Sequence, residues 1–163
     1  MESTQFCDNL LKHVQVLSNY KDISEAKLLE YVLNASVQLA QSLSGFICIV
    51  NNQGGLMSPL ITTGQIDITP KILNLDNSAA LGQIIYKNGY AIIPIPLDND
   101  LTMAIGLSTF DATYVFFIKI IAEIGYKRLE HLKTIHRLRK SRRIFNLTFE
   151  QVGSGMCQGY DFS

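Results

Sequence analysis

The feature that most constrains the fold is a long, uninterrupted helical segment near the end of the chain. It begins near Asp111 and continues beyond Lys140 without proline and with one glycine, Gly125. At roughly 30 residues it is longer than most helices of globular domains. Its first half is nearly all apolar, whereas eight Lys and Arg residues and one acidic residue lie between Lys127 and Arg143. We therefore expect the helix to pack on a core and then to leave it as a basic connector.

Shorter elements precede this helix. Apolar residues recur every three or four positions in two segments, which predicts two amphipathic helices. Several short β-rich runs bounded by Gly, Asn and Asp predict strands. The predicted helices are about 4–18, 24–42 and 78–86, and the predicted strands are 46–50, 56–63, 90–97 and 101–108. This order predicts an α+β fold, an antiparallel sheet with the N-terminal and C-terminal helices packed on one face.

The cysteines and the termini indicate a cellular compartment. Cys7, Cys48 and Cys157 are odd in number, far apart and in no CxxC pair, which argues against a disulfide framework and a structural zinc site. A reducing, cytoplasmic setting follows. Residues 1–8 contain no apolar signal sequence, and the apolar stretch 114–125 is too short to span a bilayer. We expect no membrane partner.

Several pieces of the chain, taken in order, resemble the GAF family. They are LSGFICIV at 43–50 with the Asn/Gly turn after it, LGQIIYKNG at 81–89, IPIPL at 93–97, MAIGL at 103–107, and Phe110 with Asp111. The order and spacing of these pieces carry the resemblance, which covers about residues 24–128. It implies a GAF-like sheet with helices on one face.

The end of the chain resembles the opening of a PAS domain. Residues 138–156, LRKSRRIFNLTFEQVGSGM, are similar to that family's first helix and the glycine after it. We therefore expect the natural protein to continue into a PAS domain and an output domain. The expected division is an N-terminal helix at 1–23, a GAF-like domain at 24–128, a basic connector helix at 129–143 and a truncated PAS-like start at 144–163.

Together the two resemblances imply a function. They point to a sensory or regulatory input domain of a bacterial signal-transduction protein, such as a histidine kinase or a diguanylate cyclase. The isolated chain would not be an enzyme. It would form a homodimer and relay a small-molecule or partner signal through a dimeric helix linker to the downstream PAS and output domains.

Two sets of residues are candidates for this function. A ligand pocket between the sheet and the middle helices would be lined by Phe46, Cys48, Thr62, Tyr86, Tyr90 and Met103, although the same residues are typical of a packed core. A stripe on the final helix would meet a partner helix, and it consists of Ile118, Ile121, Gly125, Leu129, Leu132 and His136.

Other functions find less support in the sequence. No HExxH, GxSxG or P-loop motif is present, and His13, His131 and His136 form no shared helical face, so no catalytic residue, metal or cofactor is expected. The basic run lacks interleaved aromatic residues, and we expect no nucleic-acid partner. Three alternatives stay open: a structural dimerisation module without ligand, a redox enzyme or sensor that uses Cys48, and a haem sensor that uses a histidine.

Overall fold

A computed structural model describes residues 3–51, 53, 55–64, 83–87, 89–98, 100–109 and 112–156. The chain divides into two units, residues 1–129 and 130–163. Five described strands form one antiparallel sheet in the first unit, in the order β2-β1-β5-β4-β3. Their bounds are Gly45–Asn51 for β1, Ile61–Thr63 for β2, Ile85–Lys87 for β3, Tyr90–Pro96 for β4 and Leu101–Leu107 for β5.

The described helices are α1 (Ser3–Ser18), α2 (Glu25–Ala40), the short 3-10 helix η1 (Ala112–Tyr114) and α4 (Val115–Met156). Ser24 caps α2, because its hydroxyl oxygen accepts a hydrogen bond from the Lys27 amide at 3.4 Å. At the other end Gln41 adopts a left-handed conformation with φ of 53°. The Ser42 amide then donates back to the Val37 carbonyl at 3.0 Å, which closes the last turn.

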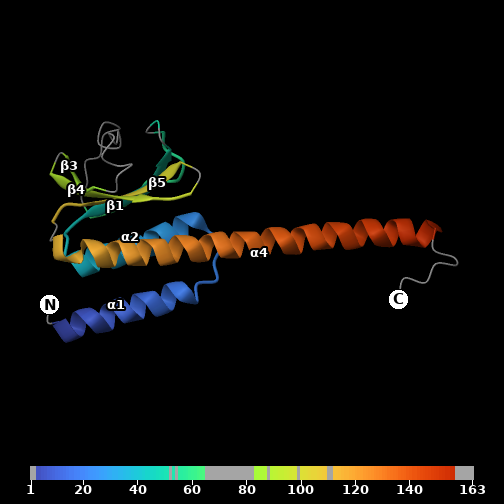
Figure 1. The fold of residues 1–163 in the computed structure, drawn as a ribbon, viewed down its shortest axis with the longest axis horizontal. Helices are drawn as coiled ribbons and strands as arrows, with labels where there is room; N and C mark the ends of the chain where they lie inside the picture. The colour runs from blue at the N-terminus through green and yellow to red at the C-terminus, as the bar shows by residue number, and fades with distance from the viewer. Residues whose placement is uncertain are drawn as a thin grey trace. The chain divides into compact units, whose positions relative to one another are not determined.

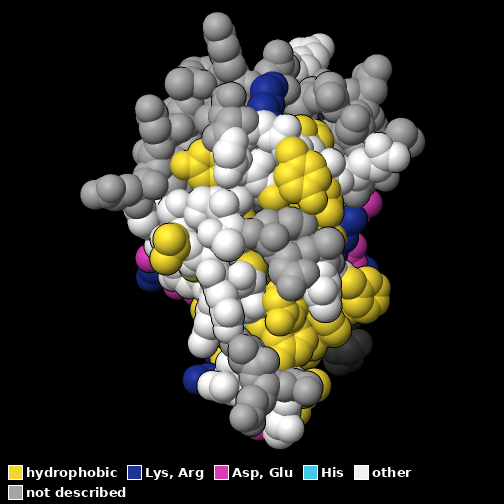
Figure 2. Space-filling model, turned by 90° about the vertical axis from the view of Figure 1, so that its left-hand side faces the viewer, with side chains coloured by type: hydrophobic (Ala, Val, Ile, Leu, Met, Phe, Trp, Pro, Cys, Tyr) yellow, Lys and Arg dark blue, Asp and Glu magenta, His cyan; other side chains and the backbone are white. Residues whose placement is uncertain are grey.

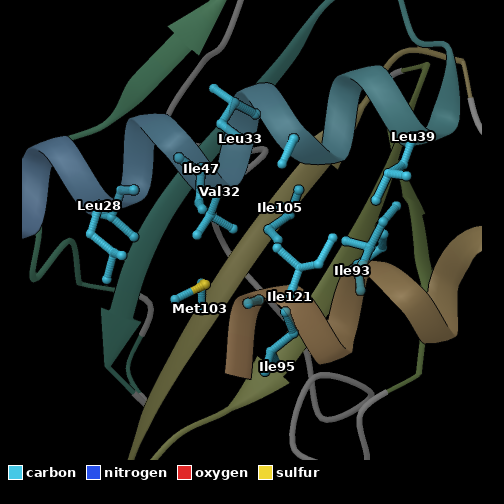
Figure 3. Packing of buried hydrophobic residues seen from close by; sticks show 14 of the residues in the cluster. Leu28, Val32, Leu33, Leu39, Ile47, Ile93, Ile95, Met103, Ile105 and Ile121 are labelled. Atoms are coloured by element: carbon cyan, nitrogen blue, oxygen red, sulfur yellow. The ribbon is translucent and has the colours of Figure 1, made fainter. Parts of the chain in front are cut away.

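The helices lie on one side of the sheet (Figure 1), with α1 on the far side of α2 and α4 from the strands. Side chains from α2, α4 and the central strands point toward one another and form the main core (Figure 3). Alternate strand residues turn to the opposite face, which we call the outer face. Its buried residues are Phe46, Cys48, Val50, Ile92 and Ala104.

Aromatic contacts attach α1 to the rest of the first unit. The Phe6 ring lies 4.9 Å from the rings of Tyr114 and Phe117, measured between centroids. At the other end of α1, the Arg128 guanidinium of α4 donates to the Tyr20 carbonyl at 2.8 Å. The first turns of α4 therefore belong to the core of the first unit.

In the second unit α4 continues as a helix to Met156. The side chains of residues 136–146 are exposed. Within the part of the chain that the structure describes, no helix combines the length and apolarity needed to cross a membrane.

Most predicted elements are confirmed, and two differ. The strand expected at 56–63 is shorter, because only Ile61–Thr63 pair as β2 and Leu56 forms an isolated bridge with Val50. Helices were expected at about 4–18 and 24–42, and strands at 46–50, 90–97 and 101–108, and α1, α2, β1, β4 and β5 lie there. Residues 85–87, in contrast, form β3 instead of the end of a helix. The cause is a two-residue hairpin loop between the paired residues Lys87 and Tyr90. Its second residue, Gly89, has φ of 82°, which suits such a turn. The predicted helix start at Asp111 and residues 78–82 lie outside the described residues.

Candidate functional site

A groove of about 410 Å³ lies at the β3 side of the sheet. Its lining residues are Tyr86, Lys87, Gly89, Tyr90, Ala91, Leu107 and Ser108. The volume falls in the range of ligand pockets, roughly 300–1,000 Å³. Figure 2 views the molecule from the end where β3 lies in Figure 1, and yellow hydrophobic side chains are exposed there among polar and backbone atoms.

Strand pairing explains why these residues meet. Tyr86 of β3 stands opposite Ala91 of β4, which in turn stands opposite Leu107 of β5. The three residues therefore form one row across the sheet. Leu107 belongs to the main core, whereas Tyr86 at the sheet edge is 71% exposed. The row therefore begins at the buried Leu107 and ends at the solvent-exposed ring of Tyr86.

Ser108, the last residue of the groove lining, also belongs to a hydrogen-bonded group that we call the serine clasp: Ser42, Ser44, Ser108 and Thr109. The Ser44 amide donates to the Ser108 hydroxyl at 3.1 Å, and that hydroxyl donates to the Ser44 carbonyl at 3.1 Å. The Ser42 hydroxyl donates to the Ser44 carbonyl at 2.8 Å and accepts from the Thr109 amide at 3.1 Å. The clasp therefore ties the turn after α2 to the segment between β5 and η1.

The predicted pocket residues fall into three places. Tyr86 and Tyr90 line the groove. Phe46 and Cys48 are buried on the outer face, and Thr62 stands opposite Phe46 in β2. The two places meet at Tyr90, whose ring packs edge-on against Phe46 with centroids 5.8 Å apart.

Met103 does not join the other predicted pocket residues. Its side chain is fully buried in the main core, among residues of α2 and α4 (Figure 3). The reason is the alternation of β5, which turns Met103 to the helix side and Ala104 to the outer face.

The thiol of Cys48 is poorly suited to nucleophilic chemistry as it lies here. Burial raises its pKa to about 12, because an apolar environment disfavours the thiolate. Cys7, on α1, is exposed, and Cys157 lies outside the described residues. Within those described residues, no group of three or more His, Cys, Asp and Glu side chains is placed to hold a metal ion.

The stripe expected to meet a partner helix is mostly occupied within the chain itself. Ile118, Ile121 and Leu129 are buried in the main core. Gly125 lies where α1, α2 and α4 approach one another, so that a Cβ there would be 3.2–3.4 Å from Val32, Leu17 and Leu28. These four positions are therefore not available to a second chain. Leu132 is half-buried and His136 is exposed.

Sequence reasoning did not find Lys87, Gly89 or the serine clasp. Gly89 had a visible signal, the Asn-Gly pair of a two-residue hairpin. Ser44 and Ser108 had none, because they become neighbours only once β1 pairs with β5, where Gly45 stands opposite Leu107.

The sequence matches no protein-family model and no curated protein. The structure is similar to the crystal structure of free methionine-R-sulfoxide reductase from Neisseria meningitidis in complex with its substrate. The TM-score is 0.52 at 13% sequence identity, over 80% of this chain and 91% of that one. At this identity the likeness shows the fold. The fold class is therefore the expected GAF-like α+β fold, with helices on one face of an antiparallel sheet and a long C-terminal helix.

The same likeness corrects one expectation. We predicted that the isolated chain is not an enzyme, and this is contradicted because a solved protein with this fold is a reductase. The absence of familiar catalytic motifs was the ground for the prediction. The fold itself supports catalysis in that protein, so motif absence was not sufficient ground.

Proposed function

We propose that this chain is a GAF-type regulatory domain that binds a small molecule in the groove beside β3. The observation that carries the proposal is that the groove shares Ser108 with the serine clasp. A bound molecule would thereby touch the segment that leads from β5 into η1 and α4. As input domain of a bacterial signalling protein, the chain would pass this change along α4 toward a PAS domain and an output domain.

The lining indicates the chemistry of the ligand. Ala91 and Leu107 supply an apolar floor, Tyr86 and Tyr90 supply aromatic surface, and the Ser108 hydroxyl supplies a hydrogen-bonding group. Lys87 adds a positive charge to this lining. We propose a small molecule with an apolar or aromatic body and one polar or anionic end.

The relay would act through hydrogen bonds that Ser108 already makes. Its hydroxyl holds both the amide and the carbonyl of Ser44, and η1 begins only four residues further along the chain. A ligand that draws the Ser108 hydroxyl toward the groove would loosen the Ser44 bonds. The turn after α2 and the start of α4 would then shift together. The ligand would contact the Ser108 hydroxyl only in the shifted conformation, and such a difference in contacts between two conformations is what lets a ligand favour one of them.

Binding measurements on the full chain test the proposal. We would record thermal shifts across a metabolite panel that includes free methionine-R-sulfoxide, because the reductase of similar fold holds its substrate. For every compound that raises the melting temperature, Tyr86→Ala should weaken binding at least about tenfold. Leu43→Ala is the control, since Leu43 is 87% exposed and does not line the groove. Hits that bind Tyr86→Ala as tightly as the unmodified chain contradict the site.

A panel without any hit would favour the alternative in which the chain is a structural dimerisation module with no ligand. Phe46 and Cys48 are fully buried. Two of the residues expected to line a ligand pocket are therefore packed in the core instead, which supports that alternative.

A thiol-dependent redox function is the second candidate, and the similarity to a reductase favours it. In such a reaction the sulfoxide is reduced to the thioether while two thiols are oxidised to a disulfide and water is released. Methionine formation from free methionine-R-sulfoxide, with dithiothreitol as reductant, measures it directly. Methionine formation that is lost in Cys48→Ser and retained in Cys7→Ser would support a reductase. The raised pKa of Cys48 weighs against it.

A further inference from the structure

The carbonyl oxygen of Ser44, inside the serine clasp, has more hydrogen-bond donors than lone pairs. The Ser42 hydroxyl donates to it at 2.8 Å, and the Ser108 amide and the Ser108 hydroxyl each donate to it at 3.1 Å. A carbonyl oxygen carries two lone pairs. The Ser42 bond is the shortest of the three, and the backbone fixes the direction of the Ser108 amide proton. The proton of the Ser108 hydroxyl is therefore the surplus donor of the clasp.

The second acceptor within reach of this proton, the Ser42 hydroxyl oxygen, does not require it either. The Ser42 and Ser108 hydroxyl oxygens lie 3.2 Å apart. The Ser42 oxygen already accepts from the Thr109 amide at 3.1 Å. Turning the Ser108 proton toward another acceptor therefore leaves no acceptor of the clasp without a donor. An acceptor left without a donor is what makes the loss of a buried hydrogen bond costly, so this change costs little.

Ser108 is the clasp residue that a ligand in the groove would meet. Ser42 and Ser44 are buried, whereas Ser108 is half-buried and lines the groove. The Ser108 hydroxyl oxygen also accepts from the Ser44 amide at 3.1 Å. A hydroxyl that accepts a hydrogen bond is polarised and becomes a stronger donor. The groove is therefore lined by a residue whose hydroxyl is ready to donate.

A surplus donor selects the chemistry of what binds. The described lining of the groove contains one cation, Lys87, and no acidic residue. One hydroxyl donor and one positive charge suit a ligand end that only accepts hydrogen bonds and carries a single negative charge, as a carboxylate does. A phosphate group carries a charge of about −1.5 to −2 at neutral pH, which one cation does not balance.

We infer, on the basis of the binding in the groove proposed above, that the groove takes a carboxylic acid with an apolar or aromatic body and that the Ser108 hydroxyl is the donor that selects it. Ser42 is then a positioning residue that acts without touching the ligand. Its hydroxyl occupies the Ser44 carbonyl and so keeps the Ser108 proton surplus. Without the Ser42 hydroxyl, the Ser44 carbonyl takes the Ser108 proton and the groove loses its donor.

Isothermal titration calorimetry of the full chain tests the ligand class with matched probes. The probes are phenylacetate, 3-phenylpropionate and indole-3-acetate, each compared with the amine of the same carbon skeleton. The acids should bind at least about tenfold more tightly than the amines, and Ser108→Ala should weaken binding of the acids at least about tenfold. Amines that bind as tightly as the acids, or acids that bind Ser108→Ala as tightly as the unmodified chain, would overturn the inference.

Ser42→Ala tests the positioning role, because Ser42 does not line the groove. It should weaken binding of the acids at least about fivefold, and Ser42→Thr, which keeps the hydroxyl, should restore it. Ser36→Ala is the matched control: the Ser36 hydroxyl is also buried and also donates to a backbone carbonyl, that of Val32 at 2.7 Å, but outside the clasp. Equal effects of Ser42→Ala and Ser36→Ala, or equal weakening of acids and amines by Ser42→Ala, would show that Ser42 has only a structural role.

The ligand class and the groove can fail separately. If compounds of the metabolite panel bind in a manner that depends on Tyr86 but none of the acids binds, the inferred ligand class is wrong and the groove remains a binding site. If the binding of no compound depends on Tyr86, the groove is not a binding site and both proposals are wrong.

Discussion

The ring of Phe46 on β1 lies directly over Gly106 on β5. The two residues stand opposite each other in the sheet. A Cβ at position 106 would overlap the Cε1 and Cζ atoms of Phe46. Gly106 is therefore required by a side chain on the neighbouring strand, and the Phe46 ring fills the outer face at the point where Tyr90 packs against it.

Gly106→Ala should destabilise the chain by about 1–3 kcal/mol, because the added methyl group displaces a fully buried ring. Urea unfolding followed by circular dichroism measures the change. In the Phe46→Leu background the same substitution should cost at least about 1 kcal/mol less, since the smaller side chain frees the space. Additive effects of the two substitutions would show that the ring and the glycine are not in contact.

Stability should fall at alkaline pH through Cys48. Burial raises its pKa in the folded chain to about 12 from the ordinary thiol value of 9.0. The unfolded chain therefore loses the thiol proton first, and stability is complete below about pH 9 and declines as the pH rises toward about 12. The loss between about pH 7 and pH 10.5 is about 2 kcal/mol.

Cys48→Ala removes this contribution to the pH dependence. The free energies of unfolding of the unmodified chain and of Cys48→Ala, measured in urea, should therefore change in parallel up to about pH 9 and diverge only at higher pH. Thiol titration gives an independent reading: in the native chain near neutral pH the exposed Cys7 should react with an alkylating reagent and Cys48 should not. Parallel pH profiles for the two proteins, or rapid alkylation of Cys48, would contradict its burial as a neutral thiol.

Local patterns were enough to predict the helices and most strands, but not how the strands pair. Periodicity marks α1, α2 and α4, and the turn residues mark the β4–β5 hairpin. The pairing of β1 with β5 joins residues that are 50 to 62 positions apart in the chain, so no local sequence pattern predicts it. The serine clasp and the Phe46–Gly106 contact both depend on that pairing, so neither could be predicted.

The candidate sites show the same limit. Tyr86 and Tyr90 were predicted to line a pocket between the sheet and the middle helices, and the structure places both in the groove beside β3. Met103 was predicted by residue type, but strand alternation places it in the main core. On α4 an apolar stripe with Gly125 was visible in the sequence. Periodicity alone does not say whether such a stripe faces its own core or a partner.

A buried polar group joins α1 to α2. The His13 ring lies 2.8 Å from the Tyr31 hydroxyl through Nδ1 and 2.9 Å from the Gln38 side-chain oxygen through Nε2. The Gln38 oxygen only accepts, so Nε2 is the donor to it, and in the tautomer that carries its proton on Nε2 the Nδ1 atom accepts from the Tyr31 hydroxyl. Tyr31→Phe leaves Nδ1 buried without that donor and should cost about 1–3 kcal/mol.

Hydrogen exchange localises the effect of Tyr31→Phe. Amides of α1 should exchange faster, whereas those of β1 and β5 should change less, because α1 packs on α2 and lies on the far side of the helices from the strands (Figure 1). Tyr20→Phe is the control, the same substitution at a half-buried tyrosine of the same region. Uniform acceleration over the whole chain would mean that α1 unfolds only together with the sheet.

A substitution at Gly125 tests whether the apolar stripe on α4 packs inside this chain or contacts a second chain. Leu17, Val32 and Leu28 surround it within the chain, so Gly125→Leu should destabilise the fold by about 3 kcal/mol or more. Glu123→Leu, at an exposed position of the same helix, should change stability by less than about 0.5 kcal/mol. Urea midpoints at two protein concentrations measure both. A Gly125→Leu protein that folds as stably as Glu123→Leu, with altered dimerisation instead, would mean that this stripe faces a second chain.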